Sequence, residues 1–285
     1  MSFENYLQEQ KYSSATVARY TESIKRFISW CEAESLSVAT FNYNDVLSFM
    51  RWCHAKGVTK RTVNNTLCVV RHYCSFLIAE GQRSDNPAAG IFIKGMVRKL
   101  PANLLSMEEM EELFKQYSIQ MNVDSSKKIM LGLMVFQGLT VGEIMRLQSH
   151  HFRLDEGKVF VKGTTRSNER LLHLQALQLP PIQNYLSHNK QKEGAVFIEQ
   201  IQKELSERNI NNRIQYMFCQ LKKLNQKVIN PKQIRSSTIT FWLRQNNLRQ
   251  VQYMAGHKWV SSTERYQTNN LDDLQNELKN HHPMK

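Results

Sequence analysis

Hydrophobic positions in the first 90 residues recur at helical spacing and predict three amphipathic helices. Apolar side chains repeat every three or four positions over residues 17–31, again over 46–53, and a third time over 63–77. Gly57 and Gly81 follow the second and third patterns, where a glycine commonly ends a helix. Each apolar face is too narrow to be buried alone, so the segment is predicted to fold as a small helical bundle.

The helical pattern lapses over residues 91–105, and a second domain is predicted to begin after them. Lysines, an arginine and a proline interrupt the apolar spacing there, which is typical of a basic interdomain linker. Ser106 and Glu109 then have the spacing of a capping box at the start of a new helix. The predicted domains are therefore residues 1–90 and 106–285.

The second domain is also predicted to be mostly helical. Two apolar runs at 158–162 and 170–174, separated by a polar turn, predict a β-hairpin. An apolar run over 126–137 predicts a buried helix, and another helix is expected directly after Thr140. Further helices are predicted near residue 177 and over 209–224, 233–245, 248–255 and from 271. The predicted fold class is mainly α, an N-terminal helical bundle plus a mostly helical domain with a small β-hairpin.

Charge points to a polyanionic partner. The chain has 38 lysines and arginines against 25 aspartates and glutamates, a formal net charge of +13 and a sequence pI of about 9.5. A field of this sign attracts phosphates, so nucleic acid is favoured over the alternative of a basic protein without a polyanionic partner. Composition alone indicates no reaction.

Other features exclude several classes of protein. The most apolar run, residues 129–136, is too short to cross a bilayer, and the N-terminus has neither the basic nor the apolar region of a secretion signal. The five cysteines include no C-x-x-C pair, and the histidines form no zinc-like array. We therefore expect a cytoplasmic protein with no disulfide and no structural metal.

The C-terminal half contains a specific series of polar residues. Lys232 lies three residues before Arg235, a Gly-His pair ends at His257, and Tyr266 follows that histidine by nine residues. This series resembles the C-terminal half of tyrosine recombinases, the phage-integrase family. That family has a His or Lys three residues before an Arg, then a Gly-His pair, then a tyrosine nine residues later.

The resemblance covers nearly the whole chain. Residues 2–90 are similar to the family's N-terminal core-binding domain. The Leu-Pro pair at 100–101, followed by the segment 105–109, resembles the start of its catalytic domain. The segment 138–147 falls where the family has its first catalytic box. Each of these motifs is a weak signal alone, but their order and spacing together are specific to the family.

The resemblance implies a DNA strand-exchange enzyme with Tyr266 as its nucleophile, acting through a 3′-phosphotyrosyl intermediate without metal, ATP or another cofactor. A phenol with a pKa of about 10 needs cationic neighbours or a base at neutral pH. Arg235 is expected to stabilise the phosphorane. Lys232 and His257 are candidates for the proton that the leaving 5′ oxygen needs, and His257 is also a candidate hydrogen-bond partner of the phosphate or the tyrosine.

The family also implies an assembly. Four protomers would bind two double-stranded DNA sites and exchange their C-terminal helices, for which residues 271–278 are the candidate. Accessory DNA-bending proteins are further implied partners, and the bound protein would be associated with the nucleoid.

Two positions depart from the family's pattern in or beside its catalytic boxes. Thr140 stands where the first box normally has an arginine, although Glu143 matches the acidic position that braces the family's active site. Thr140 and Glu143 also have capping-box spacing, which favours a role in helix initiation. Losing one transition-state arginine costs about 2–4 kcal/mol unless another cation fills the space. Ser236, where the family often has His, is expected to tune activity.

The family's hairpin lysine, the general acid, has no single counterpart here. Alignment on Glu169 and Arg170 places Thr164 or its neighbour at that position. Lys162 and Arg166 lie two residues on either side of Thr164, and strand alternation would point both to one face. Lys162 is favoured because an ammonium can donate a proton and an arginine hardly can. The alternative is a solvated charge at the end of a strand.

Candidate DNA contacts lie on two helices and on the hairpin, where a solvated polar face is the alternative in each case. The polar face of the third N-terminal helix can read guanine and adenine edges in a major groove. These candidates are Lys60, Arg61, Asn64 and Asn65, then Arg166 in the hairpin, and Arg208, Asn212 and Arg213 as a weaker set.

Three functions fit these patterns. The first is a catalytically active recombinase that is site-specific and integrates or excises a mobile element. The second is a DNA-binding accessory or regulatory relative that has lost catalysis, which the residue at position 140 favours. The third, a type IB topoisomerase, fits the short N-terminal helical domain less well, and relaxation of supercoils without pairing of two sites would distinguish it.

Overall fold

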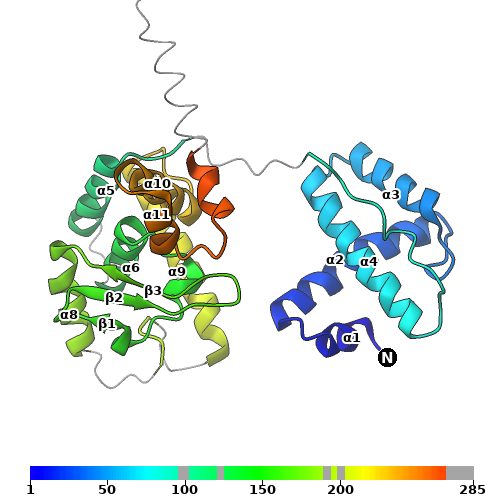
Figure 1. The fold of residues 1–285 in the computed structure, drawn as a ribbon, viewed down its shortest axis with the longest axis horizontal. Helices are drawn as coiled ribbons and strands as arrows, with labels where there is room; N and C mark the ends of the chain where they lie inside the picture. Colours follow the sequence, from blue (N-terminus) through cyan, green and yellow to red (C-terminus); the bar gives the residue numbers. More distant parts are fainter. Residues whose placement is uncertain (96–102, 121–124, 189–193, 198–202, 268–285) are drawn as a thin grey trace, which may run out of the picture. The chain divides into compact units, whose positions relative to one another are not determined.

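The computed structural model describes residues 1–95, 103–120, 125–188, 194–197 and 203–267, with the backbone alone for 118–120 and 203–209. The chain forms two compact units, Met1–Arg98 and Lys99–Lys285 (Figure 1). Each unit has its own hydrophobic core. Among the described residues, no helix is both long enough and apolar enough to span a membrane.

The first unit is a helical bundle. Its helices are α1 (Phe3–Glu9), α2 (Ser14–Ala33), α3 (Tyr43–Ala55) and α4 (Lys60–Ala79). The longest two, α2 and α4, pack together, α1 lies against α2 and α3 against α4. Phe27 of α2 is buried in the centre, with the rings of Phe41 and Phe49 each 5.0 Å from its own, centroid to centroid. The predicted bundle is found, and the seven-residue α1 is an addition that is too short to show a periodic pattern.

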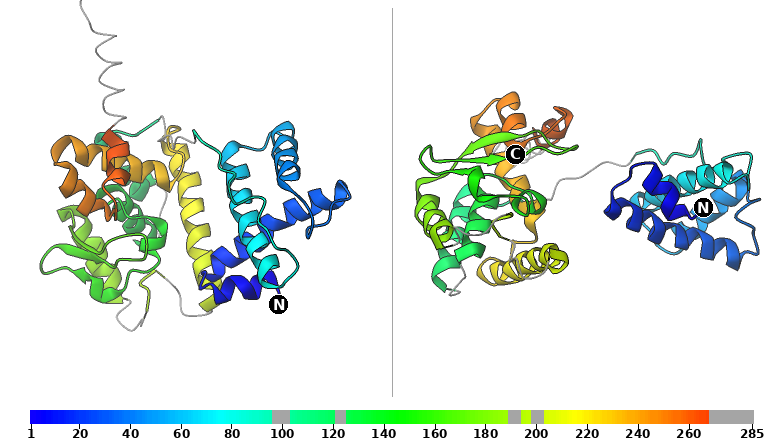
Figure 2. Two further views of the ribbon diagram at one scale, coloured as in Figure 1. Left: turned by 45° about the vertical axis from the view of Figure 1, so that its right-hand side comes forward. Right: turned by 90° about the horizontal axis from the view of Figure 1, so that it is seen from below.

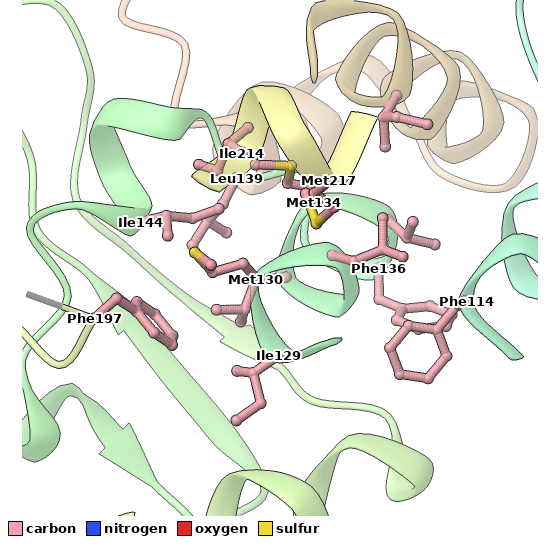
Figure 3. Close-up of a cluster of buried hydrophobic side chains, with 14 of the residues drawn as sticks. Phe114, Ile129, Met130, Met134, Phe136, Leu139, Ile144, Phe197, Ile214 and Met217 are labelled. Carbon is pink, nitrogen blue, oxygen red and sulfur yellow. The ribbon is translucent and has the colours of Figure 1, made fainter. Parts of the chain in front are cut away.

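The second unit is built around one buried helix. Its helices are α5 (Met107–Gln120), α6 (Ser125–Phe136), α7 (Val141–Ile144), α8 (Leu179–His188), α9 (Lys203–Leu224), α10 (Pro231–Gln245) and α11 (Leu248–Ala255), with 3-10 turns η1 (Ser149–His151) and η2 (Ala176–Gln178). Residues 261–267 are also helical. The most apolar run of the sequence forms most of α6, and every side chain from Ile129 to Phe136 is buried (Figure 3). Helices α5, α8, α9 and α10 all contact it, and the long α9 runs along one side of the unit (Figure 2).

A small antiparallel sheet completes this unit. Its strands, in spatial order, are β1 (Phe152–Arg153), β2 (Lys158–Val161) and β3 (Arg170–His173). Val159 lies opposite Leu172, and both point into the core around α6. The predicted hairpin is found, but each strand ends one residue earlier than expected. The third strand was not predicted, because two residues are too few to show alternation.

The segment between β2 and β3 is a loop, so the prediction that strand alternation points Lys162 and Arg166 to one face is wrong. The amide of Thr164 donates to the carbonyl of Ser167 at 2.8 Å and closes a four-residue turn. The next residue, Asn168, donates its amide to the carbonyl of Gly256 at 3.0 Å. The loop is thereby held against the C-terminal end of α11.

Candidate active site

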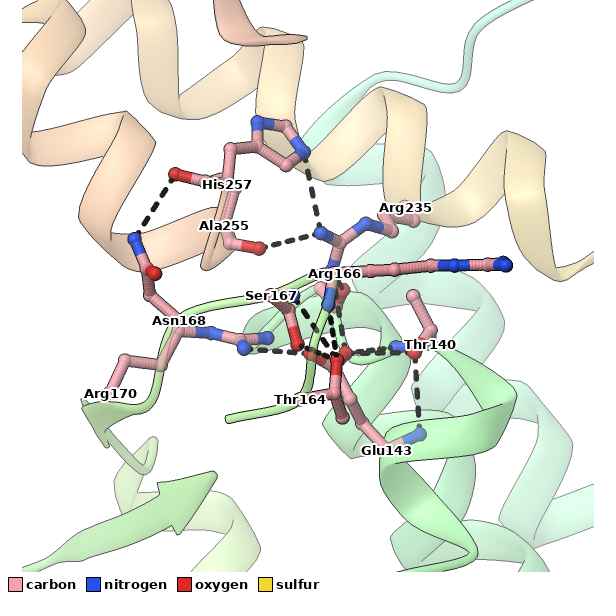
Figure 4. A network of polar contacts seen from close by, with 11 residues as sticks. Thr140, Glu143, Thr164, Arg166, Ser167, Asn168, Arg170, Arg235, Ala255 and His257 are labelled. Atoms are coloured by element: carbon pink, nitrogen blue, oxygen red, sulfur yellow. Dashed lines mark hydrogen bonds and ion pairs between the residues drawn. The ribbon is translucent and has the colours of Figure 1, made fainter. Parts of the chain in front are cut away.

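Arg235 lies in the second turn of α10 and is fixed by backbone carbonyls from two other segments. Its guanidinium donates to the carbonyl of Gly138 at 2.5 Å and to that of Ala255 at 2.6 Å (Figure 4). Gly138 follows α6 with a φ of 59°, which favours glycine. The side chain of Arg235 is 14% exposed, so a largely desolvated cation retains an edge open to a ligand. Such an edge is suited to an anion.

Behind Arg235 lies a buried carboxylate. Glu143 accepts a hydrogen bond from Nη1 of Arg170 at 2.7 Å, and its other oxygen lies 3.6 Å from Nη1 of Arg235. Burial would raise the pKa of Glu143, but the hydrogen bond from Arg170 and the charges of both arginines lower it to about 2. Glu143 is therefore ionised at neutral pH and holds two guanidinium groups in one site.

Arg170 is the most deeply buried cation of this group. Its side chain has no exposed surface, and within the described part of the chain its Nε and Nη2 atoms donate to nothing. A Cβ atom on Gly256 would lie 2.5 Å from Nη1 of Arg170, so a glycine is required where α11 ends with a φ of 65°. Arg170 can therefore act on the site only through Glu143 and through its charge.

Thr140 is fully used by the helix that it caps. Its hydroxyl accepts from the amide of Glu143 at 3.3 Å and donates to the Glu143 carboxylate at 2.9 Å, while its own amide donates to that carboxylate at 2.8 Å. The predicted capping box is confirmed. The side chain of Thr140 therefore offers no charge to a ligand.

His257 lies directly after the glycine that ends α11. Its Nε2 atom is 3.5 Å from Nη2 of Arg235, and its Nδ1 atom is 2.9 Å from the hydroxyl of Thr263. Because a guanidinium can only donate, Nε2 is the acceptor and the proton sits on Nδ1. Burial and the nearby charges of Arg235 and Arg265 lower the pKa of His257 to about 4. The imidazole is therefore neutral at pH 7.

Tyr266 lies on the helical segment that follows, and its ring stacks on that of His257. The ring centroids are 6.0 Å apart with an interplanar angle of 15°. Tyr266 is only 8% exposed, although its polar neighbours gave no sign of burial. Its charged form also interacts favourably with Arg235. A tyrosine and a histidine, two residue types suited to phosphoryl transfer, are therefore in contact beside the fixed guanidinium of Arg235.

A tyrosine on an amphipathic helix is usually a core residue, but Tyr253 on α11 is not. It is 52% exposed, and its hydroxyl accepts from the amide of Leu171 at 3.0 Å. Helix α11 buries Val251 and Ala255 instead. Tyr253 therefore ties α11 to the edge of β3.

The remaining predicted site residues are exposed cations. Lys232 lies in the first turn of α10, one turn before Arg235. Lys162 directly follows β2, and with burial and His150 it contributes to a lowered pKa of His151. Arg166 lies on the β2–β3 turn, and its side chain extends away from that turn in Figure 4. The structure thus brings Arg235, Glu143, His257 and Tyr266 together and leaves these three cations at the surface.

Comparison with protein families decides the identity of this arrangement. Residues 103–272 match the model of the phage integrase family, and residues 1–81 match that of the phage integrase N-terminal SAM-like domain. The chain belongs to the phage integrase family. The predictions of this family, of a mainly helical fold and of a tyrosine recombinase as the enzyme class are confirmed.

Individual integrase-family members are similar over nearly their full length. Tyrosine recombinase XerC of Bacillus pumilus is 25% identical over 99% of this chain and 95% of its own, and that of Mannheimia succiniciproducens is 28% identical over 98% and 95%. Among solved structures, the Tn1549 transposon integrase in complex with transposon right end DNA has a TM-score of 0.68 at 15% identity, covering 96% of this chain and 97% of that one. A lambda integrase dimer bound to a core site has a TM-score of 0.64 at 15% identity, covering 93% and 92%.

The predicted DNA contacts of this integrase-family chain differ in accessibility. Lys60, Arg61 and Asn65 are exposed and Asn64 is half-buried, all in the first two turns of α4. Asn212 is exposed on α9, whereas the side chain of Arg208 lies outside the described residues. These contacts stay predictions.

Arg213 is turned inward, away from the role predicted for it. Its guanidinium donates to the carbonyl of Phe197 at 3.3 Å and to the hydroxyl of Ser126. The guanidinium therefore ties α9 to α6 and to residue 197.

Arg170 is the site residue that sequence analysis missed. Alternation along β3 places it on the same buried face as Leu172. An arginine on the apolar face of a strand needs a buried partner, which is the pattern that would have revealed it.

Proposed function

We propose that this chain is a site-specific recombinase that cuts and rejoins double-stranded DNA through Tyr266. The observation that carries the proposal is the stacking of Tyr266 on a neutral His257, beside an arginine fixed by two carbonyls. The DNA-bound integrases of the same fold support DNA as the substrate.

The proposed reaction exchanges one phosphate ester for another. The Tyr266 oxygen attacks the scissile phosphorus as its proton leaves to a base. The bond from phosphorus to the 5′ oxygen breaks, and that oxygen takes a proton. Arg235 stabilises the charge on the non-bridging oxygens, and His257 hydrogen-bonds the phosphate or the tyrosine. The reverse reaction rejoins the DNA, and because ester bonds are conserved it needs neither ATP nor, as we propose, a metal.

The two units would divide the work. Residues 1–90 would form the core-binding domain, with the exposed side chains at the start of α4 on the DNA, and residues 106–285 the catalytic domain. The linker over 91–105 lies partly, and the exchange helix over 271–278 wholly, outside the described residues. We further propose a tetramer on paired sites, acting with accessory DNA-bending proteins to integrate or excise a mobile element, in the cytoplasm at the nucleoid.

The decisive experiment traps the covalent intermediate. The full chain is incubated, with a chelator present, with a nicked suicide substrate made from the ends of its own genetic element. We expect a protein–DNA adduct that is lost in Tyr266→Phe and kept in Tyr253→Phe, the matched control. An adduct that survives Tyr266→Phe would contradict the assignment of the nucleophile.

The same experiment tests the alternative functions. The capped, uncharged Thr140 favours a DNA-binding relative without catalysis. Tight binding of the substrate with no adduct would establish that alternative. Relaxation of a supercoiled plasmid that carries no paired sites would instead indicate a topoisomerase.

A second experiment assigns the general acid. Lys162→Ala is expected to slow cleavage by about 10²–10⁴-fold, the usual effect of losing a general acid or base. In a second substrate the leaving 5′ oxygen is replaced by sulfur. The leaving group then departs as a thiolate and needs no proton, so this substrate should restore the cleavage rate of a variant that lacks the general acid. Lys232→Ala is tested in parallel, and the sulfur substrate should rescue only the variant that lacks the proton donor.

A further inference from the structure

The site has one guanidinium fewer at its surface than the family's pattern provides, because Thr140 stands where the family has an arginine. We propose that Arg166, on the β2–β3 turn, supplies the missing guanidinium and binds a non-bridging oxygen of the scissile phosphate. The inference rests on the proposed function, since it assigns one more catalytic residue to that reaction.

The charges of the described site leave room for another cation. Arg170 has no exposed surface and is paired with Glu143, so it cannot reach a phosphate. His257 hydrogen-bonds as a neutral imidazole, as its contacts with Arg235 and a hydroxyl require. Arg235 therefore faces the negative charge of the transition state with little help from the buried groups, and its own charge is partly offset by Glu143 at 3.6 Å.

The turn that carries Arg166 has a fixed backbone. The hydroxyl of Thr164 accepts from the amides of Arg166 and Ser167, both at 3.1 Å. The two hydroxyls of Thr164 and Ser167 lie 2.9 Å apart, and the amide of Thr164 closes the turn on the carbonyl of Ser167. A turn satisfied by its own hydroxyls fixes the backbone from which the side chain of Arg166 extends.

This turn is attached to the backbone that carries His257. Ser167 forms an antiparallel bridge with His257, and the amide of Asn168 donates to Gly256. Arg166 itself is exposed, and Figure 4 shows its side chain extended from the turn. The attachment thus holds the turn that carries this solvated guanidinium against the backbone of Gly256 and His257.

Arg166 suits this role better than the neighbouring lysines. Lys162 lies close enough to His151 to act on that ring, and the ammonium of Lys258 donates to the carbonyl of Thr165 at 3.1 Å. A guanidinium also offers a planar fork of donors that matches two phosphate oxygens. Arg166 would stabilise charge and transfer no proton, so its role differs from that of the general acid.

The test separates a charge on the transition state from a contact that only binds DNA. Single-turnover cleavage of the suicide substrate is measured at saturating DNA. Arg166→Ala is expected to cleave about 100-fold more slowly than the wild type, as for the loss of one preorganised donor. On a substrate whose scissile phosphate carries a methyl group in place of one non-bridging oxygen, the charge to be stabilised is removed. The two proteins should then differ by less than about fivefold, because the removed group has nothing to stabilise.

A relocated arginine provides the second arm. Thr140→Arg, combined with Arg166→Ala, is expected to recover cleavage to within about tenfold of the wild type, since it restores the family's own donor. Arg249→Ala is the matched control, because Arg249 is exposed on α11 and bonds only its neighbour Gln252 among the described residues. That variant should cleave like the wild type on both substrates.

The following results would overturn the inference. Cleavage by Arg166→Ala at the wild-type rate would remove any catalytic role. A defect that stays equally large on the methyl-substituted phosphate would mean that Arg166 acts on structure or binding. A wild type that forms no adduct would instead overturn the proposed function, and the inference with it, so the two failures are distinguishable.

Discussion

The rear and the front of the active site are built on opposite principles. The rear, defined by Glu143, Arg170 and Gly256, is buried, and its carboxylate is paired with the guanidinium of Arg170. The front, defined by Lys162, Arg166 and Lys232, consists of exposed cations. The difference indicates which part the fold arranges in advance and which part the substrate completes.

Desolvation explains the difference. A buried guanidinium is stable only beside an anion, so the rear must be assembled as the protein folds. Exposed lysines and arginines remain hydrated and cost the fold little until a phosphate displaces their water. The rear is therefore expected to determine stability, and the front the response to DNA.

The largest effect should come from removing the carboxylate of the rear. Glu143→Gln leaves the charge of Arg170 buried without its counterion and is expected to lower the free energy of unfolding by about 3–5 kcal/mol. The control is Glu156→Gln, which breaks a surface pair with Lys158 at 3.0 Å and should cost less than about 0.5 kcal/mol. Urea unfolding of both full-length variants measures the two values. Equal losses would show that the rear is no more important to the fold than the surface.

A somewhat smaller effect is expected from filling the space over Arg170. Gly256→Ala introduces a Cβ atom 2.5 Å from that guanidinium, at a residue with a φ of 65°. Gly157 has a φ of 63° with nothing within 4 Å, so Gly157→Ala isolates the backbone strain, about 1 kcal/mol. Overpacking should add about 1–3 kcal/mol to the loss in Gly256→Ala. Matching losses in urea unfolding would mean that Arg170 moves aside freely.

The sequence patterns predicted the features that depend on residues near one another in the chain. Periodic apolar spacing predicts α2, α3, α4, α10 and α11, and caps such as Thr140 mark where helices begin, because both signals depend on neighbours a few residues away. The spacing from His257 to Tyr266 identified a pair that the structure brings into contact. Local patterns were sufficient wherever the partners lie on one or two successive elements.

Contacts between distant segments were beyond these patterns. The pairing of Arg170 with Glu143 joins residues 27 positions apart, and the attachment of the hairpin loop to Gly256 joins segments nearly 90 apart. Which tyrosine is buried also depends on packing between segments, so local patterns do not distinguish the buried Tyr266 from the exposed Tyr253. The loop geometry that separates Lys162 from Arg166 arises from turn hydrogen bonds that no alternation rule describes.

His257 stands between the two regions, and its pH dependence tests where it belongs. Its folded pKa of about 4 lies below the usual value of 6.5, so the unfolded chain binds a proton first as the pH falls. Stability is then lost as the pH falls from about 6.5 to about 4, by about 2 kcal/mol after allowing for partial exposure. Urea unfolding should show this slope in the wild type and a shallower one in His257→Gln. Parallel slopes would place His257 with the exposed front.

The smallest effect on the free protein should come from the front. Lys162→Ala and Arg166→Ala are expected to change the free energy of unfolding by less than about 0.5 kcal/mol, because both side chains are exposed. With cognate DNA present, however, both variants should gain less in Tm than the wild type, since bound phosphates stabilise the fold in proportion to their affinity. A large loss without DNA would contradict the comparison itself, because it would mean that the front, like the rear, is assembled by folding and that the substrate completes neither.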